Sequence, residues 1–252
     1  MVGEVRTAIE ENQFVTYFQP RVSVADNQIK GFEALIRWNH PEKGVTSPLD
    51  FLPYIENTDL DIQIGEWVIQ NSLKQLDEWL KQGITLEISI NISSNHLLSS
   101  SFIYDLEEAL SNYPVHYAQY LQLEILESSA FGDIQTITSI IEKCQEKLKV
   151  TFSLDDFGTG YSSLTHLRRL PVNTIKIDQT FVRDILDDPS DFSIIEGVIA
   201  LTRSFNRNVI AEGVESTNHG LLLLLMGCEL AQGYQIAKPM PIATFNQWLN
   251  NY

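Results

Sequence analysis

Two neighbouring carboxylates, Asp155 and Asp156, end an apolar segment that has the composition of a buried strand. This segment, VTFSLDDFGTG from Val150 to Gly160, passes directly from the two aspartates into a glycine-rich turn. A buried carboxylate without a compensating cation is strongly destabilising because it has lost its hydration. The pair therefore indicates a cation at this place, either a basic side chain or a metal ion.

Charged and amide side chains interrupt most of the other segments that resemble buried strands. They are Glu33 and Arg37 in GFEALIRW, Asn91 in EISIN, Glu124 in LQLEI, Lys176 and Asp178 in TIKID, Glu212 in NVIAE, and Gln232 in LAQGYQI. Parallel strands covered by helices are normally almost free of charge. Any one of these residues is explained as well by a salt bridge or a solvated strand end. The whole set is not, because most members lie toward the carboxyl ends of the strands, where barrel enzymes carry their active sites.

The composition of this set favours hard divalent cations. Lys176 and Arg37 are too few to neutralise the carboxylates of Glu33, Glu124, Asp155, Asp156, Asp178 and Glu212. Oxygen ligands without histidine or thiolate favour Mg²⁺ or Mn²⁺ over zinc. We expect two ions with one bridging carboxylate, an arrangement suited to hydrolysis of a phosphoester. Lys176 would then orient or deprotonate the attacking water or stabilise developing charge, and Arg37 would bind a phosphate through its guanidinium fork.

The turn after the aspartates has two interpretations. Gly158, Thr159 and Gly160 form either a plain strand-to-helix connection or a mobile loop that positions the aspartates and partly covers the substrate. Glu127 lies just beyond the segment that carries Glu124 and would anchor such a loop by accepting its hydrogen bonds.

Strand-like and helical segments alternate along the chain, which predicts a mostly parallel sheet built from βαβ units. The expected strands are residues 15–22, 29–38, 86–93, 120–128, 150–156, 174–178, 208–214 and 230–236. The expected helices are residues 49–82, 102–112, 134–148, 162–169, 193–205, 217–226 and 242–250. Eight strands alternating with helices in a chain of this length fit a closed (β/α)8 barrel. The first two strands are joined by only a short polar loop, so we expect a hairpin and one antiparallel strand.

Composition excludes several classes of function. The chain has 252 residues and a formal net charge of −16, which argues against coating of DNA or RNA because such binding needs basic residues. Residues 1–252 are expected to form a single domain, and a domain excised from a longer signalling protein would look the same in sequence. The longest apolar run, GLLLLLMGC, is too short to cross a bilayer and is interpreted as a buried helix face.

The two cysteines lie in no metal-type spacing, which predicts free thiols and a cytoplasmic location. The five histidines are interpreted as surface or loop residues.

Several motifs together resemble one family. FEALIRW, SINIS, LEILES, DDFGTGYSSL, KIDQTFV, AEGVES and QGYQIAKPMP occur, from Tyr17 to Pro241, in the order typical of the EAL-domain cyclic di-GMP phosphodiesterases of bacteria. The resemblance implies a modified TIM (β/α)8 barrel with an antiparallel first strand. It also implies Mg²⁺- or Mn²⁺-dependent hydrolysis of cyclic di-GMP to linear pGpG, and a homodimer built partly through the helix after DDFGTGYSSL.

The same resemblance implies roles for individual residues. It assigns Glu33, Asn91, Glu124 and Asp155 to one metal ion and Asp155, Asp156 and Glu212 to the second. Lys176 is expected to act on the catalytic water, with Glu215 and Gln232 supporting the ligands or binding water and Glu127 steadying the glycine-rich loop. The substrate is expected to contact Gln19, Leu35, Arg37 and Asp178, together with Gln232.

Two other functions stay open at this point. An EAL domain without activity would act as a receptor for cyclic di-GMP or as a protein-interaction module, and a related barrel would hydrolyse another phosphoester. The chain departs from the usual family pattern at Asp59, Leu126 and Gln179, and none of these positions is an expected metal ligand.

Overall fold

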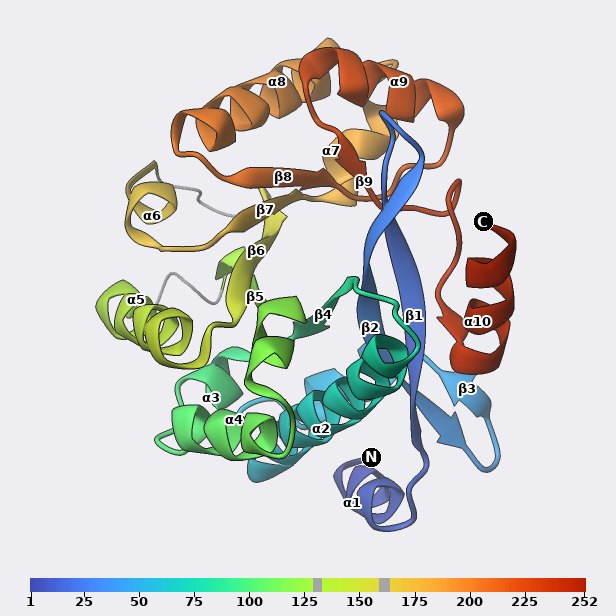
Figure 1. Cartoon of the computed structure of the whole chain (residues 1–252), viewed down its shortest axis with the longest axis vertical. Coiled ribbons are helices and arrows are strands. Elements are labelled where there is room, and N and C mark those ends of the chain that lie inside the picture. Colours follow the sequence, from blue (N-terminus) through green and yellow to red (C-terminus); the bar gives the residue numbers. More distant parts are fainter. Residues whose placement is uncertain (129–132, 159–163) are drawn as a thin grey trace.

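Eight strands close into a barrel in the computed structural model, which describes residues 1–128, 133–158 and 164–252 (Figure 1). In order around the barrel they are β1 (Phe14–Ser23), β2 (Gln28–His40), β4 (Glu87–Asn91), β5 (Leu121–Leu126), β6 (Thr151–Phe157), β7 (Thr174–Ile177), β8 (Asn208–Ala211) and β9 (Leu230–Ala231). Two short strands extend the sheet, since β3 (Gly44–Thr46) pairs with β2 and β10 (Met240–Pro241) pairs with β1. The expected barrel is confirmed.

The first strand runs antiparallel to both of its barrel neighbours. β1 pairs antiparallel with β2 and with β9, whereas β2, β4, β5, β6, β7, β8 and β9 pair parallel in sequence. The loop between β1 and β2 is too short for a crossover, so the two strands form a hairpin as the sequence predicts. Their register sets Gln19 opposite Glu33.

Helices cover the outside of the barrel (Figure 1). They are α1 (Val2–Glu10), α2 (Asp59–Lys81), α3 (Ser94–Leu97), α4 (Phe102–Ser111), α5 (Ile134–Lys143), α6 (Leu164–Arg169), α7 (Gln179–Asp184), α8 (Pro189–Ser204), α9 (Thr217–Met226) and α10 (Ile242–Asn251). The expected helix over residues 49–82 is only partly right, because short 3-10 turns at Pro48–Asp50 and Leu52–Tyr54 precede α2. Pro48 and Pro53 each sit in one of these turns, where a proline ring fits the first turn of a helix but not its interior.

Side chains on β2 alternate between two environments. Phe32, Ala34, Ile36 and Trp38 are buried beneath the helices, and Phe32 lies with its ring 4.8 Å from Trp79 of α2 and 4.6 Å from Phe245 of α10. Glu33, Leu35 and Arg37 point to the opposite face, as the period of a strand requires. The apolar layer between the barrel and its helices therefore holds the strand that carries Glu33.

The barrel interior below the carboxylates is polar rather than apolar. Arg21, Ser89, Gln122, Ser153 and Thr174 are all buried there. Arg21 donates to Gln122 Oε1 at 2.8 Å and to Glu87 Oε1 at 2.8 Å, which links three strands inside the barrel. A buried guanidinium is tolerated here because its hydrogen bonds and the nearby carboxylates compensate for the lost hydration.

The interpretation of the histidines as surface or loop residues is wrong for three of them. His40, His96 and His219 are buried, whereas His116 is exposed. His96 lies in α3 against Gly65 of α2, where an added Cβ would approach its Nδ1 to 2.1 Å, and its ring meets Phe102 edge-on at 5.1 Å. Neither ring nitrogen has a hydrogen-bond partner among the described residues. His96 therefore acts as a neutral packing residue.

Replacing His96 by leucine is expected to make stability less sensitive to acid. Burial lowers the pKa of His96 from 6.5 to about 4. Between these values the unfolded chain binds the proton and the folded protein does not, so His96 lowers stability by up to about 3 kcal/mol as the pH falls through this range. Urea unfolding of both proteins near pH 7 and near pH 4.5 checks this. An equal loss of stability in both proteins over that range would contradict it.

The apolar helix α9 is buried on one side only. Leu223 is fully buried, but Leu221 and Leu225 are exposed, Leu225 to 85%. The interpretation of GLLLLLMGC as a buried face thus holds for one side of the helix.

Both cysteines are free and buried, as expected. Within the described residues, we find no helix long and apolar enough to cross a membrane.

Candidate functional site

A cavity of about 610 Å³ opens at the carboxyl ends of the parallel strands. Its walls include nine of the residues expected from the sequence: Gln19, Glu33, Leu35, Arg37, Asn91, Asp155, Asp156, Glu212 and Gln232. Glu215 also lines it and is exposed at the rim. The fold therefore brings most of the expected site residues to one place.

Lys176 lies beneath this cavity at the centre of a carboxylate cluster. Its side chain is 0% exposed. Its Nζ lies 2.6 Å from Glu124 Oε2, 2.7 Å from Glu212 Oε1, 3.1 Å from Asp155 Oδ1 and 3.6 Å from Glu33 Oε2. One positive charge thus faces four carboxylates, supplied by β2, β5, β6 and the end of β8.

Amide side chains hold Glu33 in place. Asn91 Nδ2 donates to Glu33 Oε1 at 2.8 Å, and Gln232 Nε2 donates to Glu33 Oε2 at 2.6 Å. Gln232 also donates to Gln19 Oε1 at 3.0 Å, and Gln19 Nε2 donates to the carbonyl of Ala237 at 3.0 Å. This chain of hydrogen bonds fixes the orientation of the Glu33 carboxylate within the barrel.

The carboxylates differ in how readily they ionise. Burial alone would raise the pKa of Glu33, but Lys176 and the hydrogen bonds from Gln232 and Asn91 lower it overall. Burial raises the pKa of Glu124 to about 7, against the attraction of Lys176. Burial also raises the pKa of Asp155 and of Glu212. Burial therefore makes Glu124, Asp155 and Glu212 harder to ionise, even though Lys176 lies beside all three.

Lys176 itself stays charged. Its burial alone would lower its pKa, but the carboxylates of Asp155, Glu124, Glu212 and Glu33 raise that pKa well above the ordinary value. A permanently charged ammonium is suited to stabilising negative charge and to orienting a water molecule through its donors. It is not suited to accepting a proton while these carboxylates surround it.

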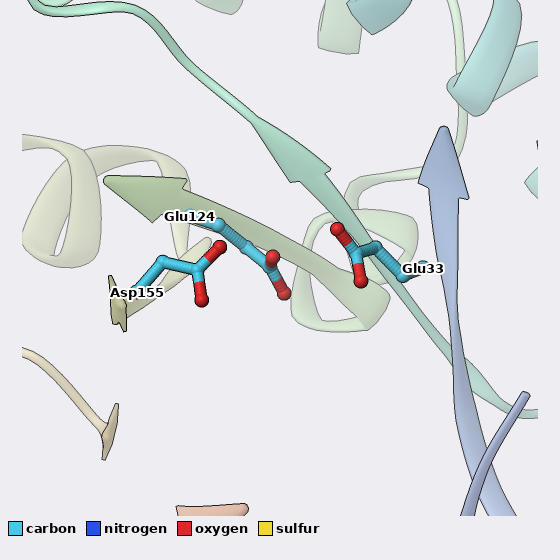
Figure 2. Close-up of side chains that lie close together, drawn as sticks. All are labelled: Glu33, Glu124 and Asp155. Carbon is cyan, nitrogen blue, oxygen red and sulfur yellow. The ribbon is translucent and has the colours of Figure 1, made fainter. Parts of the chain in front are cut away.

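Two groups of carboxylates could each hold a metal ion. Glu33, Glu124 and Asp155 form the first group, and Figure 2 shows their carboxyl groups turned toward one another. Within the group, one ligand atom from each residue lies within 4.8 Å of the others. Glu124 Oε1 is buried and has no hydrogen-bond partner among the described residues, and Arg21 Nη1 approaches it only to 3.9 Å. An unpartnered carboxylate oxygen in a cluster with excess negative charge fits a bound cation.

The second group shares Asp155 with the first and adds Asp156 and Glu212. Asp156 has a positive φ of 53°, and its backbone N–H donates to Asp155 Oδ1 at 3.0 Å. This left-handed conformation lets consecutive aspartates serve the same cluster, although neighbours in a regular strand point to opposite faces. Burial raises the pKa of Asp156 to about 6, helped by the charges of Asp155 and Asp178.

Glu127 contacts the glycine-rich turn. Its Oε2 accepts a hydrogen bond from the backbone N–H of Gly158 at 2.9 Å, as the sequence predicts. Gly158 has a φ of 108°, and a Cβ there would lie 2.6 Å from the ring of Phe181. Only glycine fits this position without strain. Thr159 and Gly160 lie outside the described residues.

The expected substrate-contacting residues fall into two groups. Leu35 and Arg37 line the cavity, with the Arg37 guanidinium 5.6 Å from the ring centre of Tyr17 and Nη1 donating to the carbonyl of Ile36 at 2.8 Å. Asp178 instead caps α7, where its carboxylate accepts hydrogen bonds from the backbone N–H and the hydroxyl of Thr180. It lies close enough to Asp156 to raise the pKa of that residue.

Sequence reasoning missed several residues at this site. Arg21 lies two residues after Gln19 in β1 and so faces the barrel interior with it, a spacing that could have revealed it. Leu126, Arg183 and Tyr234 also line the cavity. Nothing in the local pattern around Arg183 or Tyr234 marks them, although both lie in segments that follow strands.

Comparison with known proteins gives a consistent result. The family model described as EAL domain matches residues 2–239. The chain is 37% identical over 248 residues to the Cyclic di-GMP phosphodiesterase PdeR of Escherichia coli, covering 98% of this chain and 37% of that protein. It is 36% identical to the Bifunctional diguanylate cyclase/cyclic di-GMP phosphodiesterase MucR of Pseudomonas aeruginosa, covering 96% of this chain and 35% of that one. The chain thus spans little more than a third of these curated relatives.

Solved structures agree in fold. The PaMucR phosphodiesterase in complex with c-di-GMP superposes with a TM-score of 0.91 at 36% identity, covering 97% of this chain and 98% of that one. The EAL enzyme Bd1971 in its cAMP- and cyclic-di-GMP-bound form superposes with a TM-score of 0.90 at 32% identity, covering 97% and 67%. The family model spans residues 2–239, which include every strand that carries the carboxylate cluster.

Proposed function

Since this chain belongs to the EAL domain family, we propose that it hydrolyses one phosphodiester of cyclic di-GMP and releases linear pGpG. The observation that carries this proposal is the carboxylate cluster around Lys176 at the floor of an open cavity. A binding module has no need of so many uncompensated carboxylates where an anionic ligand would lie. A metal-dependent hydrolase does need them.

We propose Mg²⁺ or Mn²⁺ as the cofactor, with two ions in each site. Glu33, Asn91, Glu124 and Asp155 would hold one ion, and Asp155, Asp156 and Glu212 the other. When bound, such ions supply Lewis acidity toward the phosphate and a water molecule of lowered pKa. They would also reverse the sign of the local field, which an anionic substrate requires.

The chain's own residues then have separable tasks. Lys176 would donate to the attacking water or to the charge that develops on the phosphate, because its ammonium stays protonated. Asn91 and Gln232 would keep the Glu33 carboxylate in one orientation through the hydrogen bonds described above. Glu127 would hold the turn at Gly158 so that Asp155 and Asp156 keep their positions, and Glu215 would bind water at the rim.

The upper cavity is suited to a nucleotide. Arg37 offers a guanidinium to phosphate, while Gln19, Leu35 and Asp178 lie on the surrounding elements. Tyr234 is exposed to 60% at the rim, with Lys238 Nζ 5.2 Å from its ring centre, and so presents an aromatic face on which guanine can stack. Leu49 and Pro239 add apolar surface to the same rim.

One reaction mixture tests the proposal. The purified chain is incubated with cyclic di-GMP and Mg²⁺, and the products are separated by chromatography, with chelated and Mn²⁺-containing mixtures alongside. We expect pGpG that depends on the metal ion. Tight binding without turnover in either metal would instead indicate a receptor. Equal turnover of bis(p-nitrophenyl) phosphate would indicate a phosphodiesterase of broader specificity.

The proposal extends to the domain organisation, the oligomeric state and the location of the chain. We propose that residues 1–252 form one domain, that the chain forms a homodimer partly through the segment of α6, and that it works in the cytoplasm. The free, buried Cys144 and Cys228 support a reducing compartment. The family resemblance supports the dimer, and light scattering of the purified chain tests it.

A further inference from the structure

Two guanidinium groups line the cavity, Arg37 and Arg183, and they are placed differently. Arg37 is half-buried, with its guanidinium near the ring of Tyr17 and one N–H given to the carbonyl of Ile36. Arg183 is exposed, and across residues 1–128, 133–158 and 164–252 no carboxylate forms an ion pair with it. In a chain of net charge −16, a cation lining a cavity without such a partner is unusual.

The two arginines reach the cavity from opposite sides of the barrel. Arg37 lies on β2, and Arg183 lies on α7, directly after β7. Around the closed sheet, β4, β5 and β6 separate β2 from β7 on one side, and β1, β9 and β8 separate them on the other. The carboxylates of the cluster come from β2, β5, β6 and the end of β8, so Glu33 shares its strand with Arg37, whereas none of these carboxylates lies on α7. An anion bound at Arg183 is therefore not the anion bound at Arg37.

The position of Arg183 along α7 is also defined. Gln179 and Arg183 both line the cavity, and residues four apart share one face of a helix. Gln179 is fixed beside the carboxylates, because a Cβ on Gly213, the residue after Glu212, would lie 2.5 Å from the Cβ of Gln179. Arg183 lies about one turn, roughly 6 Å, beyond Gln179 along the helix. It therefore presents positive charge to the cavity outside the metal-binding cluster.

We propose that Arg183 binds the phosphate of cyclic di-GMP that is not being cleaved. This inference rests on the proposed function, since cyclic di-GMP carries two phosphates and hydrolysis acts on one. The carboxylate cluster with its metal ions, together with Arg37 on the strand of Glu33, takes the scissile phosphate, and the second phosphate needs a cation elsewhere in an acidic cavity. Arg183 supplies that cation and so favours a cyclic dinucleotide over a ligand with a single phosphodiester.

The test compares Arg183→Gln with Arg183→Lys and with Arg6→Gln. Arg6 lies exposed in α1 and does not line the cavity, so its variant makes the same change in net charge. The affinity for cyclic di-GMP is measured by calorimetry at several salt concentrations, with Ca²⁺ in place of Mg²⁺. Turnover is measured separately, with Mg²⁺. We expect about a tenfold or greater loss of affinity in Arg183→Gln, from the loss of a charged hydrogen bond. Arg183→Lys recovers most of it, and Arg6→Gln binds as the wild type does.

The salt dependence of the affinity distinguishes a contact of Arg183 with phosphate from a contact with a guanine base. Loss of a phosphate contact makes the affinity less sensitive to salt, because one attraction between opposite charges is removed. An Arg183→Gln variant with reduced affinity but an unchanged salt dependence would place Arg183 against guanine and overturn the inference. Affinity equal to that of Arg6→Gln would also overturn it, while turnover by the wild type would leave the proposed function standing. A wild type that neither binds nor hydrolyses cyclic di-GMP would refute the proposed function itself.

Discussion

Replacing Lys176 by methionine is expected to lower the turnover of cyclic di-GMP by about 10³-fold, within the range found for removal of a hydrogen-bond donor that stabilises charge in the transition state. Methionine keeps the length and packing of the side chain but removes the ammonium that faces Glu124, Glu212, Asp155 and Glu33. The attacking water would then lose its donor. Arg21 does not replace it, because in the described part of the chain Arg21 forms an ion pair with only one of these four carboxylates, Glu124, at 3.9 Å. Product formation measured by chromatography at saturating Mg²⁺ checks the loss.

The same substitution is expected to destabilise the metal-free protein. Removing one partner from a buried ion cluster costs about 3–5 kcal/mol, which corresponds to a fall of roughly 10 °C in Tm for a chain of this size. Saturating Mg²⁺ should restore much of this loss, because bound cations replace the missing positive charge. The matched control is Lys143→Met, an exposed lysine at the end of α5. A Lys176→Met variant with wild-type turnover, or with an unchanged Tm in chelator, would contradict the assigned role of Lys176.

The sequence predicted the barrel because its signals are local and repeated. Strand-length apolar segments alternate with helical ones, and the short loop after β1 allows only a hairpin. The carboxylates were predictable as a set for the same reason, since a charge near the carboxyl end of a parallel strand such as β5 or β6 is rare unless a site needs it. The anchoring of Gly158 by Glu127 followed from their places after neighbouring strands.

Long-range contacts explain what the sequence did not reveal. Arg21 lies in the strand that also carries Gln19. Its structural role depends on hydrogen bonds to Glu87 and Gln122, which are distant in sequence. His96 resembles a surface histidine until Gly65 and Phe102 enclose it. Helix α1 was missed because only Val5 and Ala8 of its nine residues are buried, too few for a clear apolar pattern. The left-handed φ of Asp156 also has no local signal.

Replacing Glu33 by glutamine is expected to reduce turnover by about 10²–10³-fold, because a neutral ligand loses several kcal/mol of interaction with a bound cation. The geometry adds a second penalty. Asn91 Nδ2 and Gln232 Nε2 each donate to one oxygen of Glu33, so an amide at this position would turn its own NH₂ group toward a donor. Where that donor is Gln232, its amide has to rotate and its hydrogen bond to Gln19 is lost; where it is Asn91, the bond from Asn91 is lost instead.

Metal binding separates this prediction from simple unfolding. The rise in Tm on adding a fixed concentration of Mg²⁺ should be smaller in Glu33→Gln than in the wild type, since stabilisation by a ligand follows its affinity. The control Glu146→Gln removes an exposed carboxylate from the segment Cys144–Leu148 and should keep the full Mg²⁺ effect. Circular dichroism verifies that all three proteins are folded. If Glu33→Gln kept both the wild-type Mg²⁺ shift and wild-type turnover, Glu33 would not be a metal ligand, and Glu124 and Asp155 would have to hold the first ion without it.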